Sequence, residues 1–110
     1  MSKDDYFVIV YQVLKYLYEC LKDGKTPDKE QFENMSLRLN KDYWYYIIEN
    51  LSKQGFVEGV YIKKTKDGKI IYYNEIQVTP KGIEYLFDNN LMAKAKESLK
   101  GLVDVVALFV

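Results

Sequence analysis

The chain has 110 residues, which suits a single domain with one hydrophobic core. Lysine and arginine together number 16, as do aspartate and glutamate, so any basic surface for nucleic acid or an anionic membrane must be regional. The chain has no histidine and one cysteine, Cys20. These counts exclude a histidine general base, a zinc site and an internal disulfide.

Residues 4–22 are predicted to form an α-helix, because apolar residues recur at steps of three and four. The two adjoining apolar stripes are Phe7, Val10, Leu14, Leu17 and Leu21, and Tyr6, Ile9, Val13, Tyr16 and Cys20. The strongly polar strip is narrow and consists of Gln12, Lys15, Glu19 and Lys22. Such a helix must pack against other apolar surfaces on two sides. The domain core would cover one side, and the C-terminal helix, a second copy of the chain, or both would cover the other.

Two further helices are predicted at residues 28–35 and 40–54. Pro27 suits the start of the first of these, and Asn40 is a suitable N-cap for the second. Gly55 stands where a helix-ending glycine belongs. The residues expected in the core are Phe32, Met35, Trp44, Ile47, Ile48 and Leu51.

The apolar period then changes to two, which predicts a β-hairpin. Residues 56–65 and 69–78 are expected to be its strands, and the Asp-Gly pair at 67–68 is a strong hairpin-turn signal. A two-stranded ribbon is marginal on its own, so it must pack on the helices. The expected anchors are Val57, Val60, Ile62, Ile71 and Val78.

Two helices are predicted after the hairpin. Thr79-Pro80 is typical of a helix start, and a short helix to Asn89 or Asn90 would carry Ile83, Leu86 and Phe87. Residues 91–108 are expected to form the last helix, with a bend at Gly101. Its apolar end is too short to span a bilayer, which needs ~20 apolar residues.

This order of elements predicts a mainly helical α+β fold, the winged helix-turn-helix. It consists of three helices, a two-stranded hairpin as the wing, a short helix and an additional C-terminal helix. We expect the winged helix-turn-helix domain to span residues 1–90. Residues 91–110 would form a C-terminal helix packed on the first helix or on a partner chain.

The run from Ile76 to Leu86 resembles the Thr-x-Lys-Gly-x-x-Tyr-Leu segment that follows the wing in many bacterial winged-helix proteins. Residues 44–60 and 10–17 resemble the YjcQ-type family of small bacterial and phage proteins, and the likeness extends over roughly residues 6–100. The resemblance implies a winged-helix fold. DNA binding then follows by analogy with that fold.

The turn between the second and third helices departs from the usual pattern. A helix-turn-helix usually has a glycine there, whereas this chain has Arg38. A left-handed L-residue costs about 1–2 kcal/mol. Either the turn has another shape, or Arg38 is held there because its guanidinium reaches a ligand.

Our first hypothesis is a DNA-binding transcriptional regulator of a bacterium or phage. The third helix of such a domain enters the major groove. Residues 61–74 carry four lysines and one aspartate, a local net charge of +3. The expected base contacts are Lys41, Tyr45, Tyr46 and Asn50, and the expected phosphate contacts are Arg38, Lys63, Lys64, Lys66 and Lys69. The alternative without a binding function is that these lysines only keep an exposed hairpin soluble.

Our second hypothesis is a protein-interaction module. Residues 40–54 carry two lysines, Asp42 and Glu49, so the third helix is neutral, and the two carboxylates would repel phosphates. The same helix is rich in tyrosine, a favoured residue in protein interfaces. The terminal helices also suggest a homodimer, unless they only cover each other within one chain.

Catalysis is the least favoured interpretation. The sequence has no recognisable acid–base pair and no glycine-rich phosphate loop. Asp4 and Asp5 precede the first apolar run, which is unlike a secretory signal, and a lone cysteine suits a reducing compartment. We therefore expect a cytoplasmic, non-enzymatic protein that binds no metal, no cofactor and no membrane.

Overall fold

The computed structural model of the chain describes residues 3–28, 30–32, 34 and 39–99. This part of the chain has a mainly helical α+β structure with two small antiparallel sheets. The helices and strands are α1 (Lys3–Asp23), α3 (Lys41–Lys53), β1 (Val57–Glu58), β2 (Tyr61–Thr65), β3 (Gly68–Tyr72), β4 (Gln77–Val78), α4 (Pro80–Asp88) and α5 (Asn90–Leu99). Residues 30–32 and 34 are also helical.

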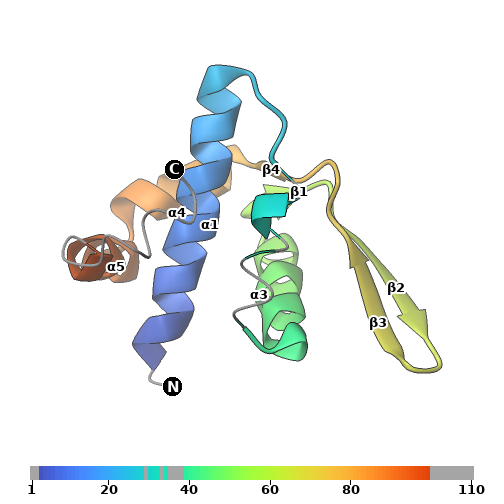
Figure 1. Cartoon of the computed structure of the whole chain (residues 1–110). Helices are drawn as coiled ribbons and strands as arrows, with labels where there is room; N and C mark the ends of the chain where they lie inside the picture. Colours follow the sequence, from blue (N-terminus) through green and yellow to red (C-terminus); the bar gives the residue numbers. More distant parts are fainter. Residues whose placement is uncertain (1–2, 29, 33, 35–38, 100–110) are drawn as a thin grey trace.

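The helix α1 runs through the middle of the molecule, with α3 on one side and α4 and α5 on the other (Figure 1). Val13 and Leu14 of α1 and Trp44 and Ile47 of α3 are fully buried in one hydrophobic core. The helix α5 packs against α1, so α1 receives its second cover from within the chain over residues 90–99. The predicted inward face of α3 is confirmed, because Trp44, Ile47, Ile48 and Leu51 are all buried.

Two residues of α1 differ from the predicted pattern. Gln12 belongs to the predicted polar strip but is only 6% exposed, because it lies where α5 crosses α1 and lines the same groove as Leu99. Leu21 belongs to a predicted apolar stripe but is 45% exposed. It lies in the last turn of α1, which extends beyond the other helices in Figure 1.

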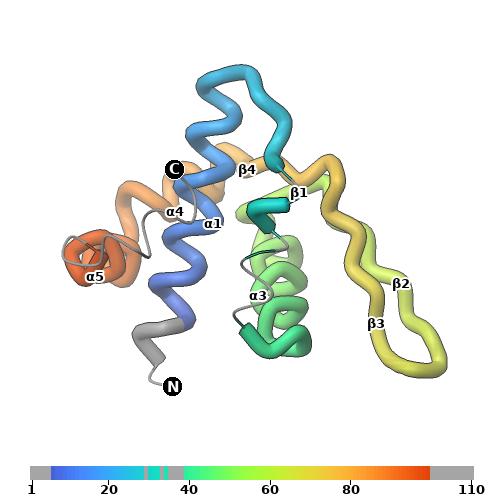
Figure 2. The backbone as a smooth tube through the Cα atoms, in the orientation of Figure 1, coloured from blue at the N-terminus to red at the C-terminus, as the bar shows by residue number. Residues whose placement is uncertain are grey.

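The hairpin forms a ribbon, defined here as residues 57–78, that is divided into two short sheets. The strands β1 and β4 pair close to the helices, with Val57 opposite Val78. The strands β2 and β3 form the outer part, with Tyr61 opposite Tyr72. Figure 2 shows the ribbon turning between the two parts and then running beside α3.

The prediction of two continuous strands is therefore wrong at residues 59–60 and 73–76. Gly59 has a φ of +81°, and a side chain there would overlap the carbonyl group of Glu75. Of the expected anchors, Val57, Ile71 and Val78 are buried and Val60 is half-buried. Ile62 is instead 37% exposed, because it lies on the outer part of the ribbon, and Ile76 is an additional buried anchor.

The helix α4 starts at Pro80, as the Thr79-Pro80 pair predicted. Thr79 also connects the start of α4 to the end of α3. Its hydroxyl donates a hydrogen bond to the carbonyl of Gly55 at 2.5 Å and accepts one from the amide of Gly82 at 3.1 Å. Leu86 of α4 is buried and Ile83 is half-buried. Phe87 is 63% exposed, and its ring packs edge-on against Tyr18 of α1.

Some predictions fall outside the described residues. They are the turn at Arg38, the position of Met35 and the continuation of the last helix past Leu99, including the bend at Gly101. Among the helices that the structure describes, none has the length and apolar character needed to cross a membrane.

Candidate nucleic-acid interface

The helix α3 is fixed at its start by Asn40. The Asn40 side-chain oxygen accepts hydrogen bonds from the backbone amides of Asp42 at 2.8 Å and Tyr43 at 3.4 Å. This capping satisfies two amides that a helix start leaves free. Because the opposite face of α3 is buried, its outward face is held in a defined orientation.

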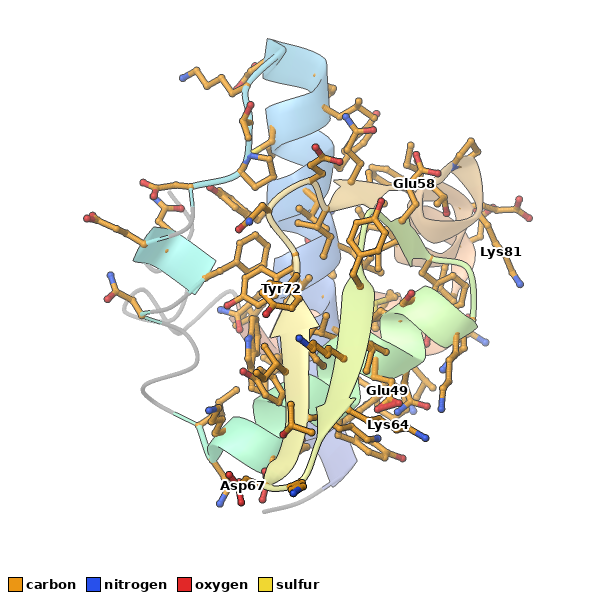
Figure 3. The ribbon with its side chains drawn as sticks, turned by 90° about the vertical axis from the view of Figure 1, so that its right-hand side faces the viewer. Glu49, Glu58, Lys64, Asp67, Tyr72 and Lys81 are labelled. Carbon is orange, nitrogen blue, oxygen red and sulfur yellow. The ribbon has the colours of Figure 1, made fainter. Side chains whose placement is uncertain are left out.

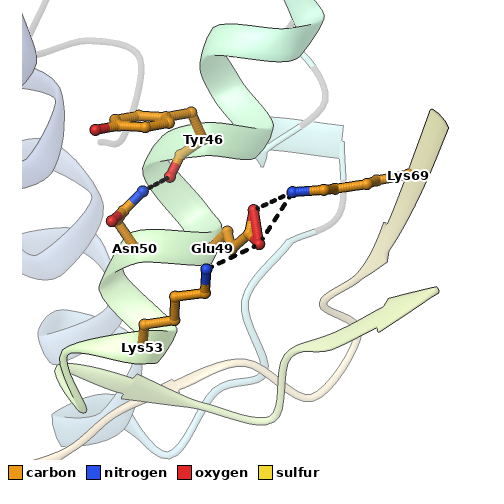
Figure 4. A network of polar contacts seen from close by, with 5 residues as sticks. All are labelled: Tyr46, Glu49, Asn50, Lys53 and Lys69. Atoms are coloured by element: carbon orange, nitrogen blue, oxygen red, sulfur yellow. Dashed lines mark hydrogen bonds and ion pairs between the residues drawn. The ribbon is translucent and has the colours of Figure 1, made fainter. Parts of the chain in front are cut away.

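The outward side chains of α3 form two groups that point in different directions (Figure 4). Tyr46 and Asn50 lie on the side of α3 toward α1, and the amide of Asn50 donates a hydrogen bond to the backbone carbonyl of Tyr46 at 2.8 Å. Tyr46 is 57% exposed, so its ring is accessible to a ligand. Glu49 points toward the ribbon, and the ammonium group of Lys53 reaches the Glu49 carboxylate.

Glu49 joins α3 to the ribbon. Its carboxylate accepts hydrogen bonds from Lys69 of β3 at 3.1 and 2.9 Å, and Lys53 lies 3.3 Å away (Figure 4). The Glu49 side chain is only 12% exposed. The hydrogen bonds from Lys69, with a smaller contribution from Lys53, lower the pKa of the Glu49 carboxyl below its ordinary value, against the burial that raises it.

This Glu49 cluster (Glu49, Lys53 and Lys69) changes the charge balance of the candidate site. The carboxylate expected to repel phosphates is compensated by two lysines within the protein. Lys69, expected to contact a phosphate, is already bound to Glu49. The pairing was not foreseen because the two residues are 20 positions apart and carry no local signal.

The remaining ribbon lysines are exposed. Lys63, Lys64 and Lys66 form no ion pair with any residue in the described part of the chain. Lys63 lies opposite Ile70 in the register, and Lys64 lies opposite Lys69. Figure 3 shows Lys64 beside the outer part of the ribbon and Asp67 at its turn.

Lys41 is exposed in the first turn of α3. Its ammonium group lies 5.4 Å from the centre of the Tyr45 ring, one helical turn further on. Tyr45 is half-buried and packs against the edge of the core. A cation over an aromatic ring at this distance is a favourable contact that leaves the ammonium group accessible.

The start of α3 and the turn between β2 and β3 lie toward the same side of the molecule, the lower side in Figure 1. The structure therefore places Lys41 and the lysines near the ribbon turn on one side. Tyr46 and Asn50 lie on a different part of α3, toward α1. Arg38 lies outside the described residues.

A shallow groove of about 360 Å³ lies between α1 and α3. Tyr6, Phe7, Tyr46, Phe56 and Tyr85 supply most of its wall, together with the amides of Asn50 and Gln54. Burial raises the pKa of the Tyr6 and Tyr85 hydroxyls. No charged side chain lines this groove, so its chemistry differs from that of the lysine-bearing ribbon.

The register of the hairpin also pairs two tyrosines outside the predicted site residues. Tyr61 and Tyr72 lie directly opposite each other and are 64% and 44% exposed. The Asp-Gly signal does not give this pairing, because the turn residues are Lys66 and Asp67 and Gly68 already pairs with Thr65 in the strands. A two-residue turn at Asp67 and Gly68 would have placed Tyr61 opposite Asn74.

Within the described residues, no three His, Cys, Asp or Glu side chains lie close enough together to hold a metal ion. The model of one protein family, described as YjcQ protein, matches residues 11–105. No curated protein and no solved structure matches the chain. The family match agrees with the resemblance seen in residues 44–60 and 10–17.

Proposed function

The chain belongs to the YjcQ family, and from that premise together with its geometry we propose that it is a winged-helix DNA-binding regulator. In this proposal α3 enters the major groove and the ribbon acts as the wing, contacting the phosphate backbone. The proposal is one of binding and assigns no catalytic role to any residue.

The observation that carries the proposal is the charge arrangement around α3. Glu49 is compensated by Lys53 and Lys69, which removes one of the two carboxylates that argued against DNA. Exposed lysines without an ion pair among the described residues remain at the start of α3 and on the ribbon: Lys41, Lys63, Lys64 and Lys66. In the first turn of α3 and in the outer part of the ribbon, residues 61–72, only Asp42 and Asp67 oppose them, so the side that would face DNA is basic although the whole chain is neutral.

The geometry suggests how contacts would be divided. The start of a recognition helix is the part that reaches base edges. Lys41 and Tyr45 lie there and are the proposed base contacts, with Tyr46 and Asn50 reaching a base only at the α1 side of α3. Lys63, Lys64 and Lys66 would contact phosphates, which gives affinity without sequence preference.

Fluorescence anisotropy with mixed-sequence duplexes tests the proposal. We expect binding at low salt that weakens as salt rises, with a slope of about 0.9 per phosphate contacted. The Lys63→Ala/Lys64→Ala variant should bind more weakly and with a smaller slope. Lys94→Ala/Lys96→Ala removes the same charge from exposed positions of α5 and is the matched control. Failure of the wild type to bind any duplex, or equal loss in both variants, would refute the proposal.

A second candidate function is favoured by the exposure of Tyr46 beside the aromatic groove between α1 and α3. We propose, as the alternative, a protein-interaction module in which Tyr46 is an anchor, since tyrosine is enriched among interface residues that dominate affinity. Specific retrieval of one protein, lost in a Tyr45→Ala/Tyr46→Ala variant but kept in Lys63→Ala/Lys64→Ala, would favour this candidate over DNA binding.

The homodimer through α1 and the C-terminal residues stays a prediction. Residues 100–110, which would contribute to it, lie outside the described part of the chain. Light scattering at high protein concentration tests it, and the mass of a monomer would reject it.

A further inference from the structure

The outer part of the ribbon exposes an unusual amount of apolar surface. Seven large apolar side chains of the described residues are exposed, and four of them lie in β2 and β3: Tyr61, Ile62, Ile70 and Tyr72. These two strands are only five residues long each. Apolar side chains gathered in one place on a surface indicate a site of contact, whereas scattered ones do not.

The two faces of this part of the ribbon differ. Directly opposite residues of an antiparallel pair point to the same face, and successive residues point to opposite faces. Ile71 is buried and Lys69 binds Glu49 of α3, so their face is turned toward the helices. The opposite face, called here the outer face, consists mainly of Tyr61, Lys63, Ile70 and Tyr72.

The outer face combines flat aromatic surface with positive charge. Tyr61 lies directly across from Tyr72, and Lys63 lies across from Ile70. All four are exposed. No carboxylate belongs to this face within β2 and β3, and Asp67 lies in the turn beyond them.

We propose that the outer face binds unpaired nucleotides of a single-stranded nucleic acid, with bases stacked on Tyr61 and Tyr72 and a phosphate beside Lys63. A single strand offers bases whose flat faces can stack on the two tyrosines, and a negatively charged backbone that can pair with the lysine. Double-stranded DNA hides its base faces in the stack, so it would use the lysine and leave both tyrosines without a partner.

The charge of the ribbon also argues against a second copy of the chain as the occupant. Two outer faces brought together would bring Lys63 of one copy close to Lys63 of the other, with no carboxylate of β2 or β3 to compensate them. Like charges in contact are unfavourable, whereas a phosphate would neutralise Lys63. The inference goes beyond the proposed function, because it concerns the outer face of the ribbon and not α3.

The test is fluorescence anisotropy with labelled oligothymidylate and oligouridylate of about 12 nucleotides, a length within the site sizes of single-strand binders. These two probes distinguish DNA from RNA as the source of the strand. A blunt duplex of mixed sequence is measured in parallel. We expect the wild type to bind at least one single strand, and the Tyr61→Ala/Tyr72→Ala variant to bind it at least about 25-fold more weakly, since each lost stack lowers affinity by about fivefold or more.

Three further variants make the test specific. Tyr61→Phe/Tyr72→Phe keeps the rings and should keep affinity within about threefold, because stacking requires no hydroxyl. Phe87→Ala removes an aromatic ring that is equally exposed but lies on α4, and it should bind like the wild type. Lys63→Ala should lower the salt slope by about 0.7, the value for one phosphate of a single strand, whereas the tyrosine variants should leave it unchanged.

The inference is overturned if the wild type binds neither single strand, or if loss of both tyrosines leaves affinity unchanged. It is also overturned if the wild type proves to be a dimer that Tyr61→Ala/Tyr72→Ala converts to a monomer, since the outer face would then be a self-contact. Duplex binding without single-strand binding would overturn this inference and leave the proposed function intact. Single-strand binding without duplex binding would do the reverse.

Discussion

Lys69 of β3 donates hydrogen bonds to both carboxylate oxygens of Glu49 of α3, at 3.1 and 2.9 Å. The contact joins the outer part of the ribbon to the helix beside it, across 20 residues of sequence. Lys64 lies directly opposite Lys69 in the ribbon and has no ion pair within the described residues. The ribbon thus presents two neighbouring lysines in different states, one bound to a carboxylate and one exposed to solvent.

We predict that Lys69→Met lowers the free energy of unfolding, whereas Lys64→Met leaves it nearly unchanged. Methionine keeps most of the lysine stem and removes the charge, so the comparison isolates the ion pair. The loss should be about 0.5–1 kcal/mol, because partly exposed pairs contribute little after solvent screening. Urea denaturation measures it, with Glu49→Gln completing a double-mutant cycle.

The cycle should show that Lys69→Met has a smaller effect once Glu49 is already glutamine. The same background should not alter the effect of Lys64→Met. Additive losses for Lys69→Met and Glu49→Gln would mean that the contact between these two residues contributes nothing measurable in solution.

The Glu49 pKa predicts how this contribution depends on pH. Lys69 and Lys53 lower the pKa of the folded carboxyl from its ordinary value of 4.5. A carboxyl with a lowered folded pKa contributes stability that is present above the unfolded pKa and is lost as pH falls through the folded pKa. The difference in free energy of unfolding between the wild type and Glu49→Gln should therefore be constant near neutrality and should decrease below about pH 4.5.

Denaturation of both proteins across this pH range is the measurement. The other carboxylates are present in both proteins, so their titration largely cancels in the difference. A difference that stays the same down to about pH 3 would show that Glu49 is not stabilised in its charged form by the two lysines.

The elements that could be predicted from the sequence are those with signals close to each other along the chain. Asn40 and Gly55 mark the ends of α3, and Thr79-Pro80 marks the start of α4, because capping joins residues within one or two turns. The buried face of α3 follows from its helical period in the same way. The start of the candidate interface at Lys41 could be located for the same reason.

The features that could not be predicted depend on distant parts of the chain. Alternation correctly assigns Ile62 and Ile71 to one face of the ribbon, but it does not say how far the ribbon extends beyond the helices, which is why Ile62 is exposed. The pairing of Glu49 with Lys69 depends on the angle of the ribbon. The ribbon is interrupted beside Gly59, where the backbone of Glu75 approaches closely, and this approach also joins parts of the chain that are distant in sequence.

Gly59 gives the next prediction. Its φ of +81° is a left-handed conformation, and a side chain at this position would overlap the carbonyl group of Glu75. Gly59→Ala should lower the free energy of unfolding by more than about 2 kcal/mol, because the overlap adds to the cost of the left-handed residue. Gly24→Ala is the matched control, since Gly24 has a φ of +67° and open space around it.

The control should lose only about 1 kcal/mol, the cost of the conformation alone. Chemical denaturation of the two variants and the wild type measures both values. Equal losses would show that the backbone near Glu75 moves aside easily, and the interruption of the ribbon would then not be fixed by Gly59.

The last prediction concerns the effect of Glu49 on DNA binding, and it depends on the proposed function. Glu49→Gln removes a negative charge beside the proposed interface and releases Lys53 and Lys69, both of which are paired only with Glu49 in the described part of the chain. We expect the variant to bind duplex DNA more tightly than the wild type although it is less stable. Its salt slope should become steeper by up to about 1.8, because each released lysine that reaches a phosphate adds about 0.9.

Stability and affinity therefore change in opposite directions, which separates this effect from general damage to the fold. Glu84→Gln removes the same charge from an exposed position of α4 and should change neither the affinity nor the slope appreciably. Anisotropy titrations from about 50 to 200 mM salt give both quantities, a range over which phosphate contacts change affinity strongly. Weaker binding by Glu49→Gln at unchanged slope would mean that the position of the ribbon matters more than the charge of its lysines, and that Glu49 serves the interface by holding β3 against α3.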